Sequence, residues 1–292
     1  MVAEHPGAGV HVRPAIECTS LLRVFESAGG RVQAVRGVDL TIDAGKAVAI
    51  VGPSGSGKSS LLRMISGIDE PSAGDVFIDG VNLVKLSNSA RRRTRARLLS
   101  HVHQRPSDNL LAHLTAFDQV ARVARRRGVD VFEASAMLER MGLADRADHL
   151  PSQLSGGEQQ RLAFARGAVG APAVVVADEP TAELDTESSD RVLDAIEHLS
   201  SEGITVLVAT HDARMLSRVD EVVTLRDGSI ASVTDRGTEL AVIDHAGRVQ
   251  LPPEVREHFP DRRAEVSWDP DSQSLTVRAP GRRQHDSQDD PS

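Results

Sequence analysis

One octapeptide, Gly52-Pro-Ser-Gly-Ser-Gly-Lys-Ser59, constrains the fold of this chain more than any other stretch. It follows the apolar run Ala47–Val51 and opens the segment Ser59–Ile65, whose apolar residues recur at helical spacing. The order strand, glycine-rich loop, helix predicts a parallel α/β fold in which the loop binds phosphate groups at the end of a strand. A chance glycine and serine turn is the alternative, and the two correct flanks argue against it.

The residue types in this loop fit a nucleotide and its metal ion. Glycines let backbone N–H groups curve around phosphate oxygens without Cβ clashes, and a helix N-terminus favours negative charge. Lys58 is expected to contact the β- and γ-phosphates of ATP, and the Ser59 hydroxyl to bind Mg²⁺. We assign the whole segment to ATP binding: Gly52, Pro53, Ser54, Gly55, Ser56, Gly57, Lys58, Ser59 and Ser60.

A second strand ends in two acidic residues. Asp178 and Glu179 directly follow the apolar run Val174–Ala177. Neighbouring side chains of a strand point in different directions, so Asp178 is expected to hold Mg²⁺ and Glu179 to polarise the attacking water. Two acids at a helix N-cap are the simpler reading, and the lysine loop elsewhere in the chain favours the catalytic one.

A third segment, Leu154-Ser-Gly-Gly-Glu-Gln159, indicates which family of phosphate-binding α/β proteins the sequence resembles. With the two preceding motifs, it makes the sequence resemble the nucleotide-binding family of ABC ATPases over about residues 16–234. The resemblance implies that Ser155, Gly156, Gly157 and Glu158 cap the γ-phosphate of the nucleotide held by the opposite subunit. Physically, this segment is another glycine-flanked helix N-terminus that offers N–H groups and a hydroxyl to an anion.

The resemblance also implies roles for four further residues. Gln104 resembles the Q-loop glutamine, which reaches Mg²⁺ and the lytic water and senses the permease. Asp185 ends a segment that resembles the D-loop, and His211 resembles the switch histidine at the γ-phosphate. Phe25 stands in the place of the aromatic residue that stacks on adenine, although an ordinary core role also fits it.

The sequence departs from the family pattern at three places. His103 replaces an aromatic residue before the glutamine, Asp118-Gln119-Val120 stands where a Glu-Asn-Val triplet is common, and Ala182-Glu183 replaces small residues of the D-loop. None of these changes removes a catalytic atom, so an active ATPase is expected. The sequence most closely resembles the lipoprotein-release, macrolide-export and cell-division group. That group implies a homodimer that drives a separate integral membrane permease.

Composition limits the other possibilities for this chain of 292 residues. The net charge of −8 gives no argument for nucleic-acid binding, and the single cysteine excludes a multi-cysteine metal site. Residues 1–14 lack the apolar segment of a signal peptide, and no stretch approaches the roughly 20 apolar residues needed to span a bilayer. We therefore expect a cytoplasmic protein that reaches the inner face of the membrane through its permease.

The predicted organisation is an ABC ATPase domain over residues 15–235, with an antiparallel β subdomain, a helical subdomain at about 87–166, and a small β-rich C-terminal appendage. Expected strands are Ile16–Phe25, Val32–Ile42 and Thr205–Ala209, and a helix is expected at Ser188–Ser201. Arginines crowd the segment Arg91–Arg97, which is either a solvated helix face or a surface that docks to permease or lipid.

The appendage, residues 239–279, resembles an AbrB-type swapped-hairpin module. The resemblance rests on Val242–Arg256, followed by alternating patterns at Ala264–Trp268 and Leu275–Val277. Residues 236–280 contain six arginines and eight acidic residues, which argues against strong binding to nucleic-acid phosphates. Dimerisation, regulation and a simple capping hairpin stay open, as does the alternative of a soluble ABC ATPase or regulator with a DNA-binding module. Residues 281–292 are expected to be disordered.

Overall fold

The computed structural model describes residues 13–27, 30–235, 237–242, 249, 255, 257–259 and 263–278. The chain divides into two compact units, Met1–Arg248 and Val249–Ser292, which are described separately. The expectations for the first 12 residues and for the tail 281–292 lie outside the described residues.

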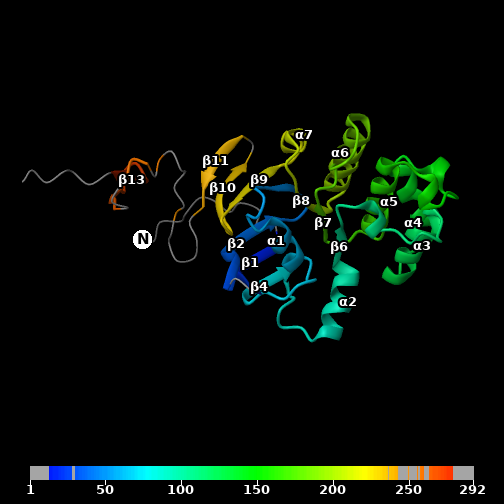
Figure 1. Ribbon diagram of the computed structural model, residues 1–292, viewed down its shortest axis with the longest axis horizontal. Helices are drawn as coiled ribbons and strands as arrows, with labels where there is room; N and C mark the ends of the chain where they lie inside the picture. The colour runs from blue at the N-terminus through cyan, green and yellow to red at the C-terminus, as the bar shows by residue number, and fades with distance from the viewer. Residues whose placement is uncertain are drawn as a thin grey trace, which may run out of the picture. The chain divides into compact units, whose positions relative to one another are not determined.

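A sheet of seven strands forms the centre of the first unit (Figure 1). Its strands lie in the order β11-β10-β9-β3-β8-β7-β6, and the five from β9 to β6 run parallel. The three in the middle are short apolar runs that are buried almost throughout, as expected for strands covered on both faces. The bounds are β3 Ala47–Val51, β6 Leu99–Val102, β7 Val174–Asp178, β8 Thr205–Ala209, β9 Glu221–Arg226, β10 Ser229–Asp235 and β11 Thr238–Ala241.

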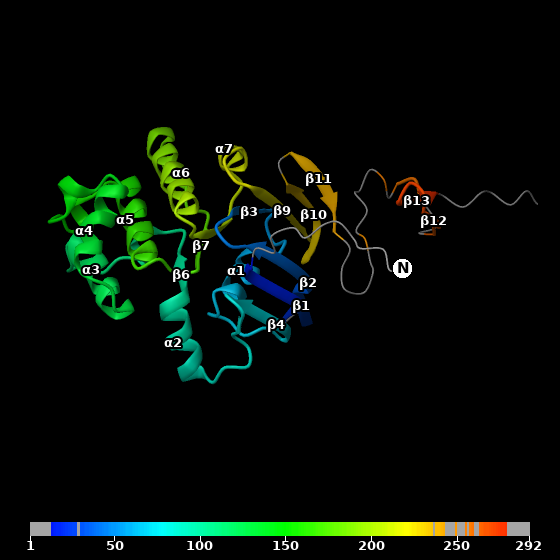
Figure 2. The same cartoon turned by 180° about the vertical axis from the view of Figure 1, so that it is seen from behind.

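A second sheet is antiparallel and has the strand order β2-β1-β4-β5. Helix α1, Lys58–Ile65, packs between the two sheets, since Leu61, Leu62 and Ile65 share one buried cluster with apolar residues of both. Figure 2 shows the sheet of β1, β2 and β4 beside α1 from the opposite side. The bounds are β1 Pro14–Ser27, β2 Gly30–Asp43, β4 Ala73–Ile78 and β5 Val81–Asn82.

Helices make up most of the segment between β5 and β7. Helices α3, α4 and α5 pack around Val120, Leu138 and Phe164, which are fully buried. Helix α3 begins where the Thr115 hydroxyl accepts a hydrogen bond from the Asp118 N–H, and it ends at Gly128 in the left-handed conformation. The bounds are α2 Asn88–Leu98, α3 Ala116–Arg127, α4 Phe132–Arg140, α5 Gly156–Ala168, α6 Thr186–Ser201 and α7 Ala213–Leu216, with single 3₁₀ turns at Pro106–Asp108, Ala144–Arg146 and Pro151–Gln153.

The α/β class, the antiparallel subdomain and the helical subdomain are confirmed. The expected strands lie within the observed ones, and two of them, Ala47–Val51 and Thr205–Ala209, have the observed bounds. Strand β6 lies inside the segment expected to be helical, and its pairing with β7 explains why: Leu99 and Val102 complete the buried edge of the central sheet. Among the described residues, the helices are all too short or too polar to cross a membrane.

The C-terminal boundary differs from the expected position. Strand β11 pairs with β10 and so continues the central sheet, and the two units divide after Arg248, not at 235–238. Most of the Val242–Arg256 pattern lies outside the described residues, so the AbrB-type resemblance stays a prediction.

The strands described in the second unit form a hairpin of β12, Glu265–Asp269, and β13, Ser274–Arg278. Val266 lies opposite Val277, and Trp268 lies opposite Leu275. Because side chains alternate along a strand, these four share one face of the hairpin. They are largely exposed, Trp268 to 60%.

Candidate nucleotide-binding site

The central sheet brings the predicted site residues to one edge. Strands β3, β8 and β7 are parallel neighbours, so the segments after their carboxyl ends lie at the same edge of the sheet. These segments are the loop 52–59, the acidic pair 178–179 and His211. We call these residues together the nucleotide edge.

Lys58 is already positioned by its own loop. Its Nζ donates to the carbonyl oxygens of Gly52, at 2.7 Å, and Pro53, at 3.2 Å. An ammonium group has three N–H donors, so one is left for a phosphate oxygen. The two carbonyls therefore fix the direction of the charge without using up its capacity to bind an anion.

Two glycines of the loop are required by close backbone approaches. A Cβ on Gly52 would lie 2.1 Å from the carbonyl oxygen of Leu225, and a Cβ on Gly57 would lie 2.2 Å from that of Ala34. Gly57 also has a φ of +103° immediately before α1. Strands β2 and β9 thus hold the loop in place, which links its shape to both sheets of the unit.

Asp178 and Ser59 meet across the end of β7. The Ser59 hydroxyl lies near the Asp178 carboxylate and favours its charged form. Burial raises the pKa of Asp178 and the charge of Glu179 adds to the rise, whereas the Ser59 hydroxyl and the charges of Lys58 and His103 oppose it. A buried carboxylate beside a hydroxyl is a site that a divalent cation would stabilise.

Mg²⁺ fits this pair. The described residues hold no group of three or more His, Cys, Asp or Glu side chains that could bind a metal by themselves. Mg²⁺ commonly takes one or two protein oxygens and completes its octahedral shell with phosphate oxygens and water. The Ser59 hydroxyl and the Asp178 carboxylate provide that small donor set.

Glu179 sits in an unusual backbone conformation, with a φ of +45°. This left-handed region is uncommon for residues other than glycine, and at functional sites it can be held by surrounding structure. Here the Glu179 N–H donates to the carbonyl oxygen of Ala209 at the end of β8, at 2.8 Å. The Glu179 carboxylate lies 2.8 Å from Nδ1 of His211. The structure thus brings together the predicted catalytic glutamate and the predicted switch histidine.

Gln104 lies exposed in the loop after β6, and no hydrogen bond joins it to Asp178 or Glu179 in the part of the chain that is described. Its loop is held by a residue that no sequence pattern indicated, the buried Asn109. The Asn109 side chain accepts from the His103 N–H at 2.8 Å and donates to the carbonyl oxygens of His103, at 3.0 Å, and Arg105, at 3.2 Å. Asn109 therefore braces the backbone on both sides of Gln104.

The segment at Ser155 caps helix α5 with a reciprocal pair of hydrogen bonds. The Ser155 Oγ accepts from the Glu158 N–H at 3.3 Å, and the Glu158 carboxylate accepts from the Ser155 N–H at 2.8 Å. Glu158 also binds Arg146 at 3.0 Å, and the Ser155 N–H is the main reason that its pKa is lowered. Within one chain, Glu158 shapes the cap, and the Ser155 hydroxyl keeps its own proton for another acceptor.

The predicted D-loop residue lies beside this cap. Asp185 caps α6 and accepts hydrogen bonds from the N–H and the hydroxyl of Ser188, both at 2.9 Å. A Cβ on Gly157 would lie 2.6 Å from Cβ of Ser188, and a Cβ on Gly156 would lie 3.5 Å from the Leu184 side chain. Gly157 of the segment 154–159, which we call the signature segment, thus lets α5 approach α6 closely.

Phe25 is 38% exposed near the end of β1. The guanidinium of Arg23 lies 4.6 Å from the centre of its ring. A core role is excluded by this exposure, and stacking on adenine stays a prediction.

Comparison with known proteins agrees with this geometry. Residues 35–182 match the family model of the ABC transporter. The chain is 40% identical over 224 residues to a lipoprotein-releasing system ATP-binding protein LolD of Hyphomonas neptunium, covering 75% of this chain and 97% of that protein. It is 38% identical over 237 residues to a macrolide export ATP-binding/permease protein MacB of the same organism, covering 80% of this chain and 36% of MacB.

Among solved structures, the chain is similar to the ATP-binding cassette MJ0796 in a dimeric post-hydrolysis state bound to ADP and Pi. The TM-score is 0.69 at 30% identity, over 75% of this chain and 98% of that one. A second similar structure is cbiO1 of Clostridium perfringens, part of the cbiONQ transporter complex, with a TM-score of 0.67 at 26% identity over 76% of this chain and 89% of that one. Sequence and structure agree that the chain belongs to the ABC transporter family and carries its ATPase cassette.

Proposed function

We propose that this chain hydrolyses ATP as a homodimer and so powers a membrane permease on a separate polypeptide. The proposal rests on one observation: three sets of side chains lie together at the carboxyl ends of β3, β7 and β8. They are the Lys58 ammonium, the Ser59–Asp178 pair and the Glu179–His211 pair.

Glu179 is the group proposed to act on water. One oxygen of its carboxylate contacts His211. The other has no hydrogen-bond partner among the described residues, so it can accept a hydrogen bond from a water molecule and orient it for in-line attack. His211 restricts the rotation of this carboxylate. Lys58 would stabilise the charge that develops on the phosphate oxygens, and Ser59 and Asp178 would hold Mg²⁺, which neutralises the β- and γ-phosphate charges when bound.

The signature segment is proposed to act on the nucleotide of the partner subunit. Its hydroxyl, at Ser155, accepts from the backbone and can still donate to a phosphate oxygen. The N-terminus of α5 adds N–H groups and a favourable dipole. The similarity to a dimeric cassette bound to ADP and Pi supports this arrangement.

The coupling to a permease is supported by the relatives. LolD is named as a component of a lipoprotein-releasing system, and MacB combines an ATP-binding and a permease part in one protein. The present chain matches about a third of MacB, and none of its described helices could cross a membrane. We place the protein in the cytoplasm, at the inner face of the membrane.

The test is the substitution Glu179→Gln, which keeps the shape of the side chain and removes its charge. Loss of a general base is expected to lower steady-state ATP hydrolysis by about a thousandfold. ATP with Mg²⁺ should then hold the variant as a dimer in size-exclusion chromatography. The control is Glu187→Gln, since Glu187 is exposed on α6 and its one ion-pair partner in the described part of the chain is Arg191. Unchanged hydrolysis by Glu179→Gln would refute the role of Glu179.

Purification from solubilised membranes tests whether the protein binds a permease. Tagged Glu179→Gln protein with ATP and Mg²⁺ is expected to retain an integral membrane protein in stoichiometric amount, and the Lys58→Ala variant to retain less. If no membrane protein is retained with either variant, an ATPase without a permease is the better description.

A further inference from the structure

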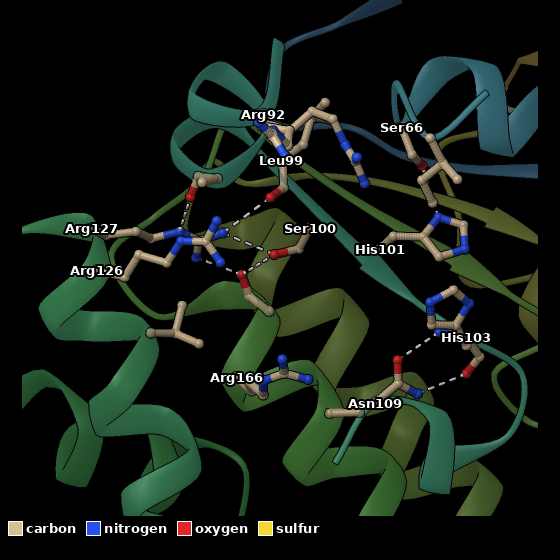
Figure 3. Close-up of a pocket in the computed structure, with 16 residues that line it drawn as sticks. Ser66, Arg92, Leu99, Ser100, His101, His103, Asn109, Arg126, Arg127 and Arg166 are labelled. Carbon is tan, nitrogen blue, oxygen red and sulfur yellow. Dashed lines mark hydrogen bonds between the residues drawn. The ribbon is translucent and has the colours of Figure 1, made fainter. Parts of the chain in front are cut away.

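A cavity of about 390 Å³ lies between α2, β6, α3 and α5. Sixteen residues line it, and none of them is Asp or Glu (Figure 3). We call it the arginine pocket, after the residues it gathers from three helices: Arg92, Arg95, Arg126, Arg127 and Arg166.

One of these arginines has a structural role. Arg127 donates to the carbonyl oxygens of Ala96, Leu99, Gly167 and Val169 and to the hydroxyl of Ser100. Figure 3 draws the hydrogen bonds from Arg127 to partners that line the pocket. It ties α2, β6 and the end of α5 together. Its hydrogen-bonding capacity is used within the protein, so it contributes charge to the pocket but few free donors.

The other four arginines are not paired. No hydrogen bond or ion pair joins a described residue to the side chains of Arg92, Arg95, Arg126 and Arg166, and the Nε of Arg95 is buried without a partner. Burial lowers the pKa values of Arg95 and Arg166, and the charge of Arg126 lowers both further. The pocket therefore concentrates positive charge that no acidic side chain balances.

Two histidines complete the polar lining. The rings of His101 and His103 lie 4.5 Å apart, and Figure 3 shows them across the pocket from Arg166. The Ser66 hydroxyl donates to the Leu62 carbonyl oxygen and so accepts from Nδ1 of His101. Burial lowers the pKa of His101 to about 4, so this ring is neutral at pH 7. It adds polarity to the lining without adding repulsion.

We propose that the arginine pocket binds a compact anion that carries one or more phosphate groups. Guanidinium groups recognise phosphate oxygens with paired N–H donors, and here they converge from three different helices on one cavity. A compact ligand with many oxygens fits convergent donors better than an extended acidic peptide does. The bound anion would relieve the repulsion among the arginines. Its source is either a free phosphate compound or a phospholipid headgroup, and this inference does not depend on the proposed function.

The test is calorimetric titration of pyrophosphate into protein saturated with ADP, so that the loop 52–59 is already occupied. Arg166→Gln and Arg95→Gln are each expected to weaken binding about tenfold, the typical effect of losing a charged hydrogen bond. The matched control is Arg93→Gln, because Arg93 is exposed on the same helix as Arg95 but does not line the cavity. Equal affinity in wild type, Arg166→Gln and Arg95→Gln would overturn the proposal.

Two further measurements sharpen the result. If Lys58→Ala abolishes pyrophosphate binding and Arg166→Gln does not, the anion binds at the nucleotide edge and the proposal is wrong. A hexaglutamate peptide that binds more tightly than pyrophosphate, with the same dependence on Arg166, would instead assign the pocket to an acidic protein segment and also overturn it.

Binding to lipid vesicles distinguishes the two sources of the anion, a phospholipid headgroup and a free phosphate compound. Phosphatidylcholine vesicles with and without phosphatidylglycerol are sedimented with wild type and Arg166→Gln. Binding that needs both phosphatidylglycerol and Arg166 indicates a lipid headgroup. Pyrophosphate binding that needs Arg166, without vesicle binding, indicates a free phosphate compound.

Discussion

The nucleotide edge and the arginine pocket both collect charged side chains in one unit of the molecule, but they treat these charges differently. At the nucleotide edge each charge already has a partner: Lys58 has two carbonyl oxygens, Asp178 has Ser59 and Glu179 has His211. In the pocket Arg127 has partners within the protein, whereas the other four guanidinium groups have none among the described residues.

The difference separates two ways to build a site. Partners within the protein fix the direction of each catalytic group before substrate arrives, which lowers the cost of organising the site during reaction. Unpaired charges of one sign have no such geometry, and they store repulsion that an anion of opposite sign relieves. The two regions should therefore respond oppositely to the removal of a charge.

The largest expected effect comes from replacing Arg127, the pocket arginine that donates hydrogen bonds to the protein itself. Arg127→Met removes five hydrogen bonds and leaves the partly buried carbonyl oxygens of Ala96 and Val169 without this donor, so the free energy of unfolding should fall by about 3 kcal/mol. Urea unfolding monitored by circular dichroism measures it. The control is Arg125→Met, whose exposed side chain on the same helix has no described partner. A loss of equal size in both variants would contradict the role of Arg127.

A second prediction concerns pH. The pKa of His101 is about 4 in the folded chain and 6.5 in the unfolded chain. Between these values the unfolded chain binds a proton that the folded chain does not, so stability falls as the pH drops from 6.5 towards 4. The loss should be about 2 kcal/mol greater in wild type than in His101→Gln, measured by urea unfolding at several pH values. Parallel pH profiles would contradict the shifted pKa.

Asn109 lines the pocket and also braces the loop of Gln104, the predicted sensor of Mg²⁺ and water. In Asn109→Ala the loop loses three hydrogen bonds, so kcat for ATP hydrolysis should fall about tenfold, or roughly 1.4 kcal/mol in the barrier. Asn109→Asp keeps the acceptor for the His103 N–H and should recover part of the rate. If both variants hydrolyse ATP at the wild-type rate, the brace has no catalytic importance.

The smallest expected effect completes the comparison. Arg166→Gln removes an unpaired charge beside Arg122 and Arg126, so its free energy of unfolding should stay within about 0.5 kcal/mol of wild type or rise slightly. Thermal unfolding in low salt measures the difference. A loss as large as that of Arg127→Met would show that Arg166 has a partner in the folded chain.

The nucleotide edge could be predicted from the sequence because its parts are local motifs. The loop 52–59 and the pair 178–179 each follow an apolar strand, and parallel strands place their carboxyl ends together. The left-handed backbone of Glu179 could not be predicted, since it depends on the hydrogen bond to Ala209 on another strand.

The arginine pocket could not be predicted for a related reason. Arg92, Arg126 and Arg166 come from three separate helices, and only their packing around β6 makes them neighbours. Strand β6 itself was hidden in a segment of helical character, since Leu99–Val102 alternates weakly and is short. Likewise, nothing in the sequence marks Asn109 as the partner of the His103 and Arg105 backbone, because the contact closes a loop of irregular structure.

The close approach of α5 to α6 has a mechanical consequence. With less than a methyl group of space between Gly157 and Ser188, and with Ser188 bonded to Asp185, the first turn of α5 cannot tilt without carrying the start of α6 along. In the proposed dimer, the first turns of α5 and α6 would then move as one rigid body against the neighbouring subunit. A step that displaces the start of one helix would displace the start of the other with it.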